Sequence, residues 1–383
     1  MRILYIANLR LPAEKAYGIQ IAKMCEAFAL AGNEVTLTYP FRRNYPENKV
    51  SIFEYYSIKN NFKIKRLIAP DFFISGILGK ITFHLNNFIS AIILCIYGLF
   101  SGADIIYSRD ELPLYFLSFF KKNLVFEAHK FSNVRSLYYK KFRVGGMKII
   151  SITDALKKEF INAGFLDSNV VVAPDGVDLD EFKADVSKKE ARIKTGLPQD
   201  RTIIMYTGHL FEWKGAHILA EAAEYIPEIL FVFVGGTSHD VKQFREKYGQ
   251  AGNILILGHK QHKEISAFLS AADVLVLPNS IKDKISGYTS PLKLFEYMAS
   301  NRPIVASDLE SIREILNEKN SVLVKPNDPK DLVRGINMIL NDGGLAEKII
   351  IQALMDVKNY TWSKRAEYID TVFRQQLLKI KNP

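Results

Sequence analysis

Residues 287–306 have the sequence GYTSPLKLFEYMASNRPIVA, in which a helical segment runs directly into an apolar strand. Ser290 is a good N-cap and Pro291 suits the first helical position, so we expect the helix to begin there. Its unpaired amide groups, from Leu292 onward, would attract an anion such as a diphosphate. Glu296 follows on the same helix, where it could accept hydrogen bonds from the hydroxyl groups of a ribose. The alternative interpretation is an ordinary capped helix with a surface glutamate.

Short apolar runs alternate with helical patterns through almost the whole chain, which is typical of parallel sheets flanked by helices. The expected fold class is therefore α/β, with two Rossmann-like, doubly wound parallel-sheet domains that face a central cleft. The strands predicted in the first half are Ile3–Ala7, Glu34–Tyr39, Ile105–Tyr107, Leu124–Phe126, Lys148–Ile152 and Val170–Ala173. Those predicted in the second half are Thr202–Tyr206, Leu230–Val234, Ile254–Leu257, Val274–Leu277, Pro303–Ala306 and Ser321–Val324.

These two series predict the domain boundaries. Residues 1–180 form an N-terminal Rossmann-like domain. Residues 181–200, which are charged and poor in strand signal, form a linker. Residues 201–361 form a second Rossmann-like domain, and residues 362–383 carry a long amphipathic helix.

Composition narrows the possible partners and compartment. The formal net charge is +10, from 51 Lys+Arg against 41 Asp+Glu, which favours anionic partners. No Lys/Arg stripe or nucleic-acid-binding motif accompanies this charge, so we expect no nucleic acid partner. The two cysteines, Cys25 and Cys95, form no C-x-x-C pair and favour a reducing compartment. The N-terminus lacks a signal-peptide layout, and the longest apolar run, Phe88–Phe100, is shorter than a membrane span, so we expect a cytoplasmic protein.

A second candidate for phosphate binding lies in residues 207–215, TGHLFEWKG, which follow a predicted strand and lead into a helix. Gly208 would let the backbone approach a phosphate, and Lys214 could neutralise its charge. The alternative is an ordinary strand-to-helix turn with a solvated lysine.

Together these segments resemble the GT-B fold glycosyltransferases of family 4, and the resemblance covers essentially the whole chain. Residues 208–215 are similar to the family's glycine-to-lysine-glycine segment, whose lysine binds the donor phosphates. Residues 290–308 are similar to its nucleotide-sugar helix and the strand after it, which implies that Glu296 binds ribose. In the first half, Ala16-Tyr17-Gly18-Ile19 resembles the loop that approaches the phosphates. The resemblance also implies that the C-terminal helix, residues 362–383, crosses back to the N-terminal domain.

Two positions depart from the family's pattern. The first glutamate of its paired-glutamate motif would fall at Tyr288, so backbone amides around Thr289 are a possible substitute for holding the sugar. Its phosphate-binding arginine corresponds to His209, a weaker and pH-dependent cation. Lys214 would then carry more of the charge neutralisation, together with Lys293.

His129 is the candidate catalytic residue of the first half. Phe126-Glu127-Ala128-His129 resembles the strand end that presents a histidine to the transferred sugar, although a lone histidine is more often structural. The resemblance implies a retaining mechanism in which His129 hydrogen-bonds the sugar and the leaving phosphate helps to deprotonate the acceptor. The protein then acts by stabilising the diphosphate and orienting two substrates.

No metal and no other cofactor are expected. Asp178-Leu179-Asp180 spells the D-x-D of metal-dependent transferases with a different fold, but it falls at the end of the first domain, beside the linker. We interpret it as a chance match.

An acceptor or membrane surface is a hypothesis for part of the span Phe62–Phe100, which is rich in aromatic and aliphatic residues and contains Lys63, Lys65, Arg66 and Lys80. We favour Phe72–Phe83 as a surface for anionic lipid or a lipid acceptor, and expect Phe88–Phe100 to be a buried helix. In the second half, the base of the nucleotide is expected near His259 and Lys260.

The predicted function is metal-independent, retaining transfer of a hexose or related sugar from a UDP- or GDP-sugar to a glycan or lipid-linked saccharide. Synthesis of cell-surface polysaccharide or glycoconjugate is the expected setting, with the protein cytoplasmic or peripheral on the inner face of the membrane. Two alternatives stay open: a non-catalytic subunit that binds a nucleotide sugar, and a sugar-nucleotide epimerase on the same fold.

Overall fold

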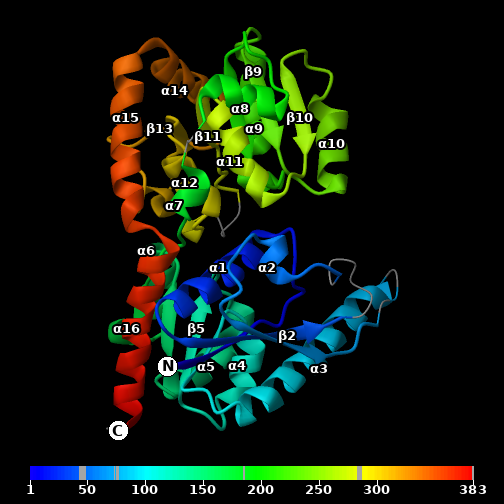
Figure 1. The fold of residues 1–383 in the computed structure, drawn as a ribbon, viewed down its shortest axis with the longest axis vertical. Helices are drawn as coiled ribbons and strands as arrows, with labels where there is room; N and C mark the ends of the chain where they lie inside the picture. The colour runs from blue at the N-terminus through cyan, green and yellow to red at the C-terminus, as the bar shows by residue number, and fades with distance from the viewer. Residues whose placement is uncertain (43–48, 73, 75–76, 184–185, 283–286, 382–383) are drawn as a thin grey trace. The chain divides into compact units, whose positions relative to one another are not determined.

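The structure, a computed structural model of the chain, describes residues 1–42, 49–72, 74, 77–183, 186–282 and 287–381. It consists of two compact units, Met1–Pro174 together with Trp362–Pro383, and Asp175–Thr361 (Figure 1). Each unit is built on its own parallel sheet. The expected α/β class with two Rossmann-like, doubly wound sheets is confirmed.

The first unit contains a 7-stranded sheet in the order β3-β2-β1-β4-β5-β6-β7. Its strands are β1 (Arg2–Ile6), β2 (Glu34–Phe41), β3 (Lys63–Ile68), β4 (Ile105–Ser108), β5 (Leu124–Ala128), β6 (Lys148–Ser151) and β7 (Val170–Val172). The chain runs outward from β1 to β3 and then returns to β4 beside β1, so the strand order reverses between β1 and β4. Doubly wound sheets bind ligands beyond the carboxyl ends of strands at such a switch point.

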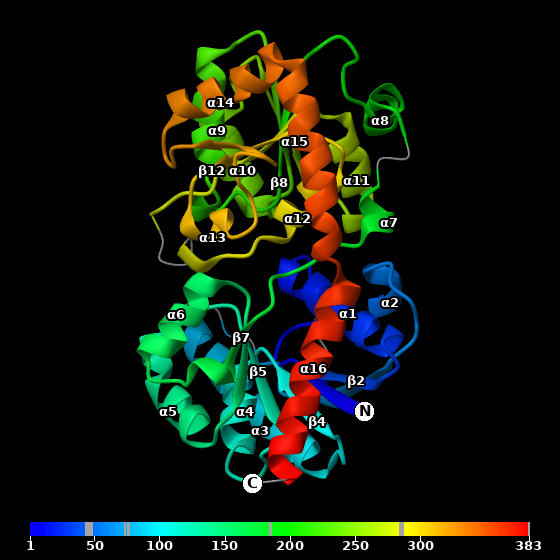
Figure 2. The same cartoon turned by 90° about the vertical axis from the view of Figure 1, so that its left-hand side faces the viewer.

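The helices of this unit are α1 (Ala16–Leu30), α2 (Ile52–Tyr55), α3 (Ile77–Phe100), α4 (Glu111–Leu117), α5 (Ser136–Val144), α6 (Asp154–Asn162) and α16 (Trp362–Lys381). The C-terminal helix α16 packs beside α1, although more than 300 residues separate them in the sequence (Figure 2). The rings of Phe28 and Phe373 lie 5.4 Å apart, and Asn33 donates a hydrogen bond to Asp370 over 3.0 Å.

Strand β3 was not predicted. Lys63, Lys65 and Arg66, assigned from the sequence to a basic surface segment, are exposed and lie on this strand at the edge of the sheet. All six of its residues are at least partly exposed, and among the described strands only β2 pairs with it. An edge strand therefore lacks the continuous apolar run by which the buried strands were recognised.

Helix α3 is longer and more exposed than the sequence suggested. Its segment Gly79–Phe100 is long and apolar enough to cross a membrane by length and composition alone. Within the unit, however, Ala91 and Leu94 are fully buried, whereas Phe88 is 45% and Phe100 is 85% exposed. The expectation that Phe88–Phe100 is a buried helix is therefore correct for one face only.

The second unit contains a 6-stranded parallel sheet in the order β10-β9-β8-β11-β12-β13. Its strands are β8 (Ile203–Thr207), β9 (Leu230–Val234), β10 (Ile254–Gly258), β11 (Val274–Leu277), β12 (Ile304–Ser307) and β13 (Val322–Val324). Successive residues enter different apolar clusters, as Met205 and Tyr206 do, so both faces of the sheet are covered. The strand order reverses between β8 and β11.

The main helices of this unit are α7 (Leu179–Phe182), α8 (Lys188–Thr195), α9 (Ala216–Ala222), α10 (Ser238–Tyr248), α11 (His262–Ala271), α12 (Leu292–Ala299), α13 (Glu310–Arg313), α14 (Pro329–Asn341) and α15 (Gly343–Asp356). The span predicted as a linker, residues 181–200, contains α8, which packs on α11. Buried Arg192 of α8 donates to Ala271 O over 3.0 Å and pairs with Asp273 over 2.7 Å.

Candidate functional site

Two glycines shape the loop between β8 and α9, at the switch point of the second sheet. Gly208 follows β8 with φ of 123°, a conformation that favours glycine. Gly215 has φ of 74° and lies so close to Pro278, just after β11, that a Cβ there would lie 1.7 Å from the Pro278 carbonyl oxygen. The residues between them, including Lys214, are therefore fixed beside the carboxyl ends of β8 and β11.

Two lysines lie at this loop, and neither forms an ion pair with a carboxylate of the described residues. Lys293 is buried, with only 7% of the residue exposed. Its Nζ lies 3.7 Å from the centre of the Tyr206 ring. Among the described residues, this Nζ has no hydrogen-bonding partner. Burial and the nearby charge of Lys214 hold the pKa of Lys293 well below its usual value. Burial also lowers the pKa of Lys214, to about 8.

Such a pair is costly in a protein without a ligand, because both charges are desolvated and repel each other. An anion placed between Gly208 and the two ammonium groups would relieve both effects. Asn279, fully buried just after β11, adds two amide atoms that also lack a partner in the described part of the chain. The sequence patterns gave no signal for Asn279, because they do not show which polar side chains are buried.

Helix α12 begins one residue later than expected. Pro291 is its N-cap, with extended backbone angles, and the first helical residue is Leu292. Ser290, predicted as the N-cap, instead accepts a hydrogen bond from the backbone amide of Asp175 over 3.3 Å. Pro291 has no side-chain oxygen that could cap the first turn, so the backbone amides of Leu292 and Lys293 stay available to an anion.

Glu296 lies one turn further along α12, and its side chain is 11% exposed. Its Oε1 lies 3.1 Å from Nε2 of His262, the first residue of α11, and His262 Nδ1 lies 2.8 Å from Glu181 of α7. The two carboxylates raise the pKa of His262 to about 10, against the opposing effect of burial. His262 was not among the predicted site residues, because nothing in its sequence context marks it.

The other predicted residues of this unit have different surroundings. The His209 ring stacks on Phe211 at 4.9 Å, and its Nδ1 lies 4.0 Å from Asp240. Thr289 is buried. Three further predicted residues are at least partly exposed: Tyr288, His259 and Lys260. The roles assigned to these five residues remain predictions.

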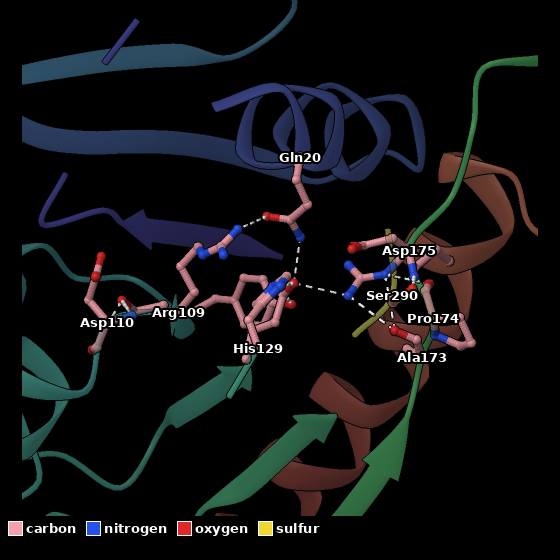
Figure 3. Close-up of polar contacts among 12 residues, drawn as sticks. Gln20, Arg109, Asp110, His129, Ala173, Pro174, Asp175 and Ser290 are labelled. Atoms are coloured by element: carbon pink, nitrogen blue, oxygen red, sulfur yellow. Dashed lines mark hydrogen bonds and ion pairs between the residues drawn. The ribbon is translucent and has the colours of Figure 1, made fainter. Parts of the chain in front are cut away.

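In the first unit, His129 follows β5 and is half-buried. Its Nε2 lies 2.7 Å from Oε1 of Glu127, which is fully buried. Gln20 of α1 and Tyr107 of β4 donate to the same carboxylate, so that Gln20 and His129 converge on it (Figure 3). Arg109 in turn donates to Gln20 over 2.9 Å.

The fourth partner of Glu127 comes from the C-terminal helix. Arg365 of α16 pairs with Glu127 over 3.0 Å and donates to the carbonyl oxygens of Ala173 and Pro174 over 3.3 and 2.9 Å. Burial would raise the pKa of Glu127, but Arg365 and His129 hold it well below its usual range. A glutamate directly after a predicted apolar strand could have signalled a buried ion pair, but no pattern identified Arg365 as its partner.

The predicted phosphate-loop residue Gly18 lies at the start of α1. A Cβ on Gly18 would lie 2.0 Å from the Tyr56 hydroxyl, which exchanges hydrogen bonds with the backbone of Ala13. Packing within the unit therefore explains this glycine without a ligand.

The lowered pKa of Lys214 predicts that nucleoside diphosphates bind more weakly as the pH rises above 8. Free Lys214 loses its proton near pH 8, whereas bound diphosphate favours the charged form, so binding takes up a proton. We expect the Kd of the nucleotide that the protein binds best among UDP, GDP and ADP to rise about tenfold per pH unit between pH 8.5 and 9.5. Isothermal titration calorimetry measures this. In Lys214→Arg, the slope of log Kd against pH should fall by about one, because arginine stays protonated in this range. An unchanged slope would show that the proton is taken up by another group.

Part of this chain matches a known family. Residues 187–354 match the family described as Glycosyl transferases group 1. The chain is 26% identical to D-inositol 3-phosphate glycosyltransferase of Xylanimonas cellulosilytica, over 53% of this chain and 51% of that protein. It is 28% identical to phosphatidyl-myo-inositol mannosyltransferase of Mycobacterium tuberculosis, over 58% of each chain. The matches thus span between about half and three fifths of these relatives' length.

Solved structures resemble the chain over its full length. Sucrose-phosphate synthase from Thermosynechococcus elongatus superposes with a TM-score of 0.78 at 19% identity, covering 99% of both chains. HepE of Anabaena, in complex with UDP-glucose, gives a TM-score of 0.78 at 18% identity, covering 98% of this chain and 100% of that one. At these identities the likeness establishes the fold of the whole chain.

Proposed function

We propose that the protein is a retaining glycosyltransferase of family 4, since residues 187–354 match the Glycosyl transferases group 1 family and the whole chain has the GT-B fold. It takes a sugar from a UDP- or GDP-sugar and transfers it to a glycan or lipid-linked saccharide. The proposed setting is the synthesis of cell-surface polysaccharide or glycoconjugate.

The observation that carries this proposal is the lysine pair at the switch point of the second sheet. Lys214 and Lys293 have lowered pKa values and no carboxylate partner in the described residues, so their environment favours an incoming anion. The start of α12 adds amide groups and the positive end of the helix dipole. This arrangement suits a diphosphate, whose developing charge it would stabilise as the sugar departs.

We assign further parts of the donor to named residues. Glu296, a few residues beyond Lys293 on the same helix, binds the ribose hydroxyls. Backbone amides around Thr289 hold the sugar where the family usually has a glutamate. His129 of the first unit hydrogen-bonds the transferred sugar, and Glu127 sets the orientation of its ring. The lysines and the helix start supply the positive charge, so we propose that no metal is needed; transfer that persists in EDTA would support this.

The proposed acceptor is a glycan or a lipid-linked saccharide. Two relatives have names that specify an inositol phosphate and a phosphatidyl-myo-inositol acceptor, which supports an anionic or lipid-borne acceptor here. The net charge of +10 fits such a partner.

Thermal unfolding with a panel of UDP, GDP, ADP and their sugar conjugates tests the proposed donor site. A ligand that binds only the folded protein raises the melting temperature, and more so as its concentration exceeds the dissociation constant. We expect a rise with one nucleotide family, which would also identify the base. No rise with any of them at millimolar concentration would contradict the proposal and favour a subunit that does not bind nucleotide sugars.

We also propose that the protein is cytoplasmic and binds peripherally to an anionic membrane through α3. Apolar side chains between 37% and 85% exposed repeat along one face of this helix: Ile81, Leu85, Phe88, Ile92, Ile96 and Phe100. Phe72, Ile74 and Phe83, from the segment favoured in the sequence, are also exposed, whereas residues 73, 75 and 76 of that segment lie outside the described residues. A helix with one buried and one apolar exposed face suits the surface of a bilayer.

Co-sedimentation with phosphatidylglycerol liposomes at low salt tests this surface. We expect Ile81→Glu combined with Ile96→Glu to lower binding at least tenfold, because each buried isoleucine contributes about 1.5–3 kcal/mol. Ile351→Glu is the control, since Ile351 is 52% exposed on α15 of the other unit. Wild-type protein that stays in the supernatant, or equal loss in the control, would rule out α3 as the membrane surface.

A further inference from the structure

A histidine of the second unit lies between two carboxylates from different helices. His262 Nδ1 lies 2.8 Å from Glu181 of α7, and its Nε2 lies 3.1 Å from Glu296 of α12. The three side chains are only 15%, 17% and 11% exposed, respectively. His262 Nε2 hydrogen-bonds to Glu296, and Nδ1 lies within ion-pair distance of Glu181, so the ring carries a positive charge.

Without its two carboxylate partners, the positive charge of His262 would be unfavourable at this position. His262 is the first residue of α11, where the helix dipole repels a cation. Burial also disfavours the charged ring. Both carboxylates are therefore needed to hold the imidazolium in place, and the ring in turn holds both of them.

Glu181 lies on α7, a helix of 4 residues whose position is fixed at both ends. Asp178 caps α7, and its Oδ1 accepts hydrogen bonds from the backbone amides of Asp180 and Glu181 over 3.1 and 3.4 Å. Phe182, the last residue of α7, is 2% exposed and packs its ring 5.5 Å from that of His262. The Asp178-Leu179-Asp180 sequence, which resembles a metal-binding D-x-D, thus has a structural role as the cap of α7.

The consequence falls on the carboxylate of Glu296. A glutamate side chain has three rotatable bonds, and fixing them on binding a ligand costs conformational entropy. Here Oε1 is already fixed by His262, and no hydrogen bond from the described residues reaches Oε2. The carboxylate is thus oriented before a ligand arrives, with one oxygen available to accept a hydrogen bond.

We propose that His262, supported by Glu181, is a positioning residue that orients Glu296 toward the ribose of the nucleotide donor. This inference rests on the proposed function, because it takes the ligand of Glu296 to be a nucleoside diphosphate sugar. His262 does not touch the donor. It acts through Glu296 and makes the site selective for ribose over deoxyribose.

Paired affinities for a ribonucleotide and its 2′-deoxy counterpart test the proposal. The probe is whichever of UDP, GDP and ADP the wild-type protein binds most tightly, with dUDP, dGDP or dADP as its pair, measured by calorimetry. A hydrogen bond to a charged group predicts a preference of about tenfold or more for the ribonucleotide in the wild type. In His262→Gln and in Glu181→Gln we expect this ratio to fall below about threefold, mainly through weaker binding of the ribonucleotide.

Two variants calibrate the result. Glu296→Gln should reduce the ratio in the same way, since it alters the ribose-binding group itself. Lys263→Gln removes a positive charge from the neighbouring, exposed position of α11 and should leave the ratio unchanged. Glu181→Gln keeps the pair between His262 and Glu296, so it remains informative if His262→Gln does not fold, as judged by circular dichroism.

The outcomes separate the inference from the function on which it rests. Equal weakening of both nucleotides in His262→Gln and Glu181→Gln, with the ratio preserved, would give these residues a structural role only and overturn the inference. Wild-type protein that binds nucleotides without preferring ribose would overturn it as well, while leaving the proposed function intact. Wild-type protein that binds none of the three would overturn both.

Discussion

Replacing Lys214 with alanine should lower kcat/KM for sugar transfer by about 100- to 1,000-fold, the loss found when one group that stabilises a developing charge is removed. Lys214 lies between the two glycines of the β8–α9 loop, burial lowers its pKa, and no carboxylate of the described residues forms an ion pair with it. Its positive charge is therefore used mainly when the diphosphate leaves. Initial rates with the donor identified by thermal unfolding measure the effect.

The matched control is Lys242→Ala, which removes an exposed lysine from α10 of the same unit and should change kcat/KM less than twofold. Combining Lys214→Ala with Lys293→Met should cost less than the sum of the single losses, because both residues stabilise one diphosphate. Near-normal activity in Lys214→Ala would show that the diphosphate is bound elsewhere.

Lys293→Met should stabilise the ligand-free protein. Below pH 9, we expect it to raise the free energy of unfolding of the free protein by ~1–2 kcal/mol, because a buried charge is replaced by an apolar group and only the contact with the Tyr206 ring is lost. The pKa of Lys293 is lowered in the folded state, so the cost of its charge is present at neutral pH and the gain should vanish as the pH approaches 10. Urea unfolding of the ligand-free variant measures this difference.

Arg365→Met should lower the free energy of unfolding by about 3–5 kcal/mol, since removing one partner of a buried pair leaves the other charge uncompensated. Arg365 and Glu127 are 3% and 0% exposed, and Arg365 also satisfies the carbonyl oxygens of Ala173 and Pro174. Urea unfolding at pH 7, followed by circular dichroism, measures the loss. A loss below about 1 kcal/mol would show that the ion pair does not determine the stability of this unit.

The same ion pair predicts how this loss depends on pH. The pKa of Glu127 is lowered in the folded protein, so its contribution to stability is complete above the unfolded pKa of about 4.3 and is lost as the pH falls toward the folded pKa. Without Arg365 the pKa of Glu127 rises, so the difference between wild type and variant should shrink between pH 7 and pH 5. Adding Glu127→Gln to Arg365→Met should restore part of the stability, because the isolated charge is gone.

The parallel sheets were predictable because burial on both faces leaves a local signal. Residues 203–207 and 230–234 are apolar throughout or nearly so, and each forms a buried strand of the second sheet. Strand β3 escaped prediction because an edge strand needs no such run. The exposed face of α3 was not predicted, because an apolar run in the sequence does not show how much of its surface is buried in the folded protein.

The residues of the proposed donor site could be selected from the sequence for a similar reason. Gly208, Lys214, Lys293 and Glu296 belong to two short segments, so their type and spacing are visible in the sequence. The sequence did not show that Lys293 is buried near the charge of Lys214, or that His262 is an imidazolium beside Glu296. Charge and pKa depend on burial and on partners, which local spacing does not report.

The sequence by itself determined the two doubly wound sheets, the glycine-to-lysine loop and the helix that carries Lys293 and Glu296, because each depends on residues close together in the chain. Only the tertiary structure decided that Arg365 pairs with Glu127 across 238 residues, and that His262 joins Glu296 across 34 residues. Such pairs form where separate elements pack against each other. Their energy comes from desolvation and direct charge contact, neither of which exists until the chain has folded.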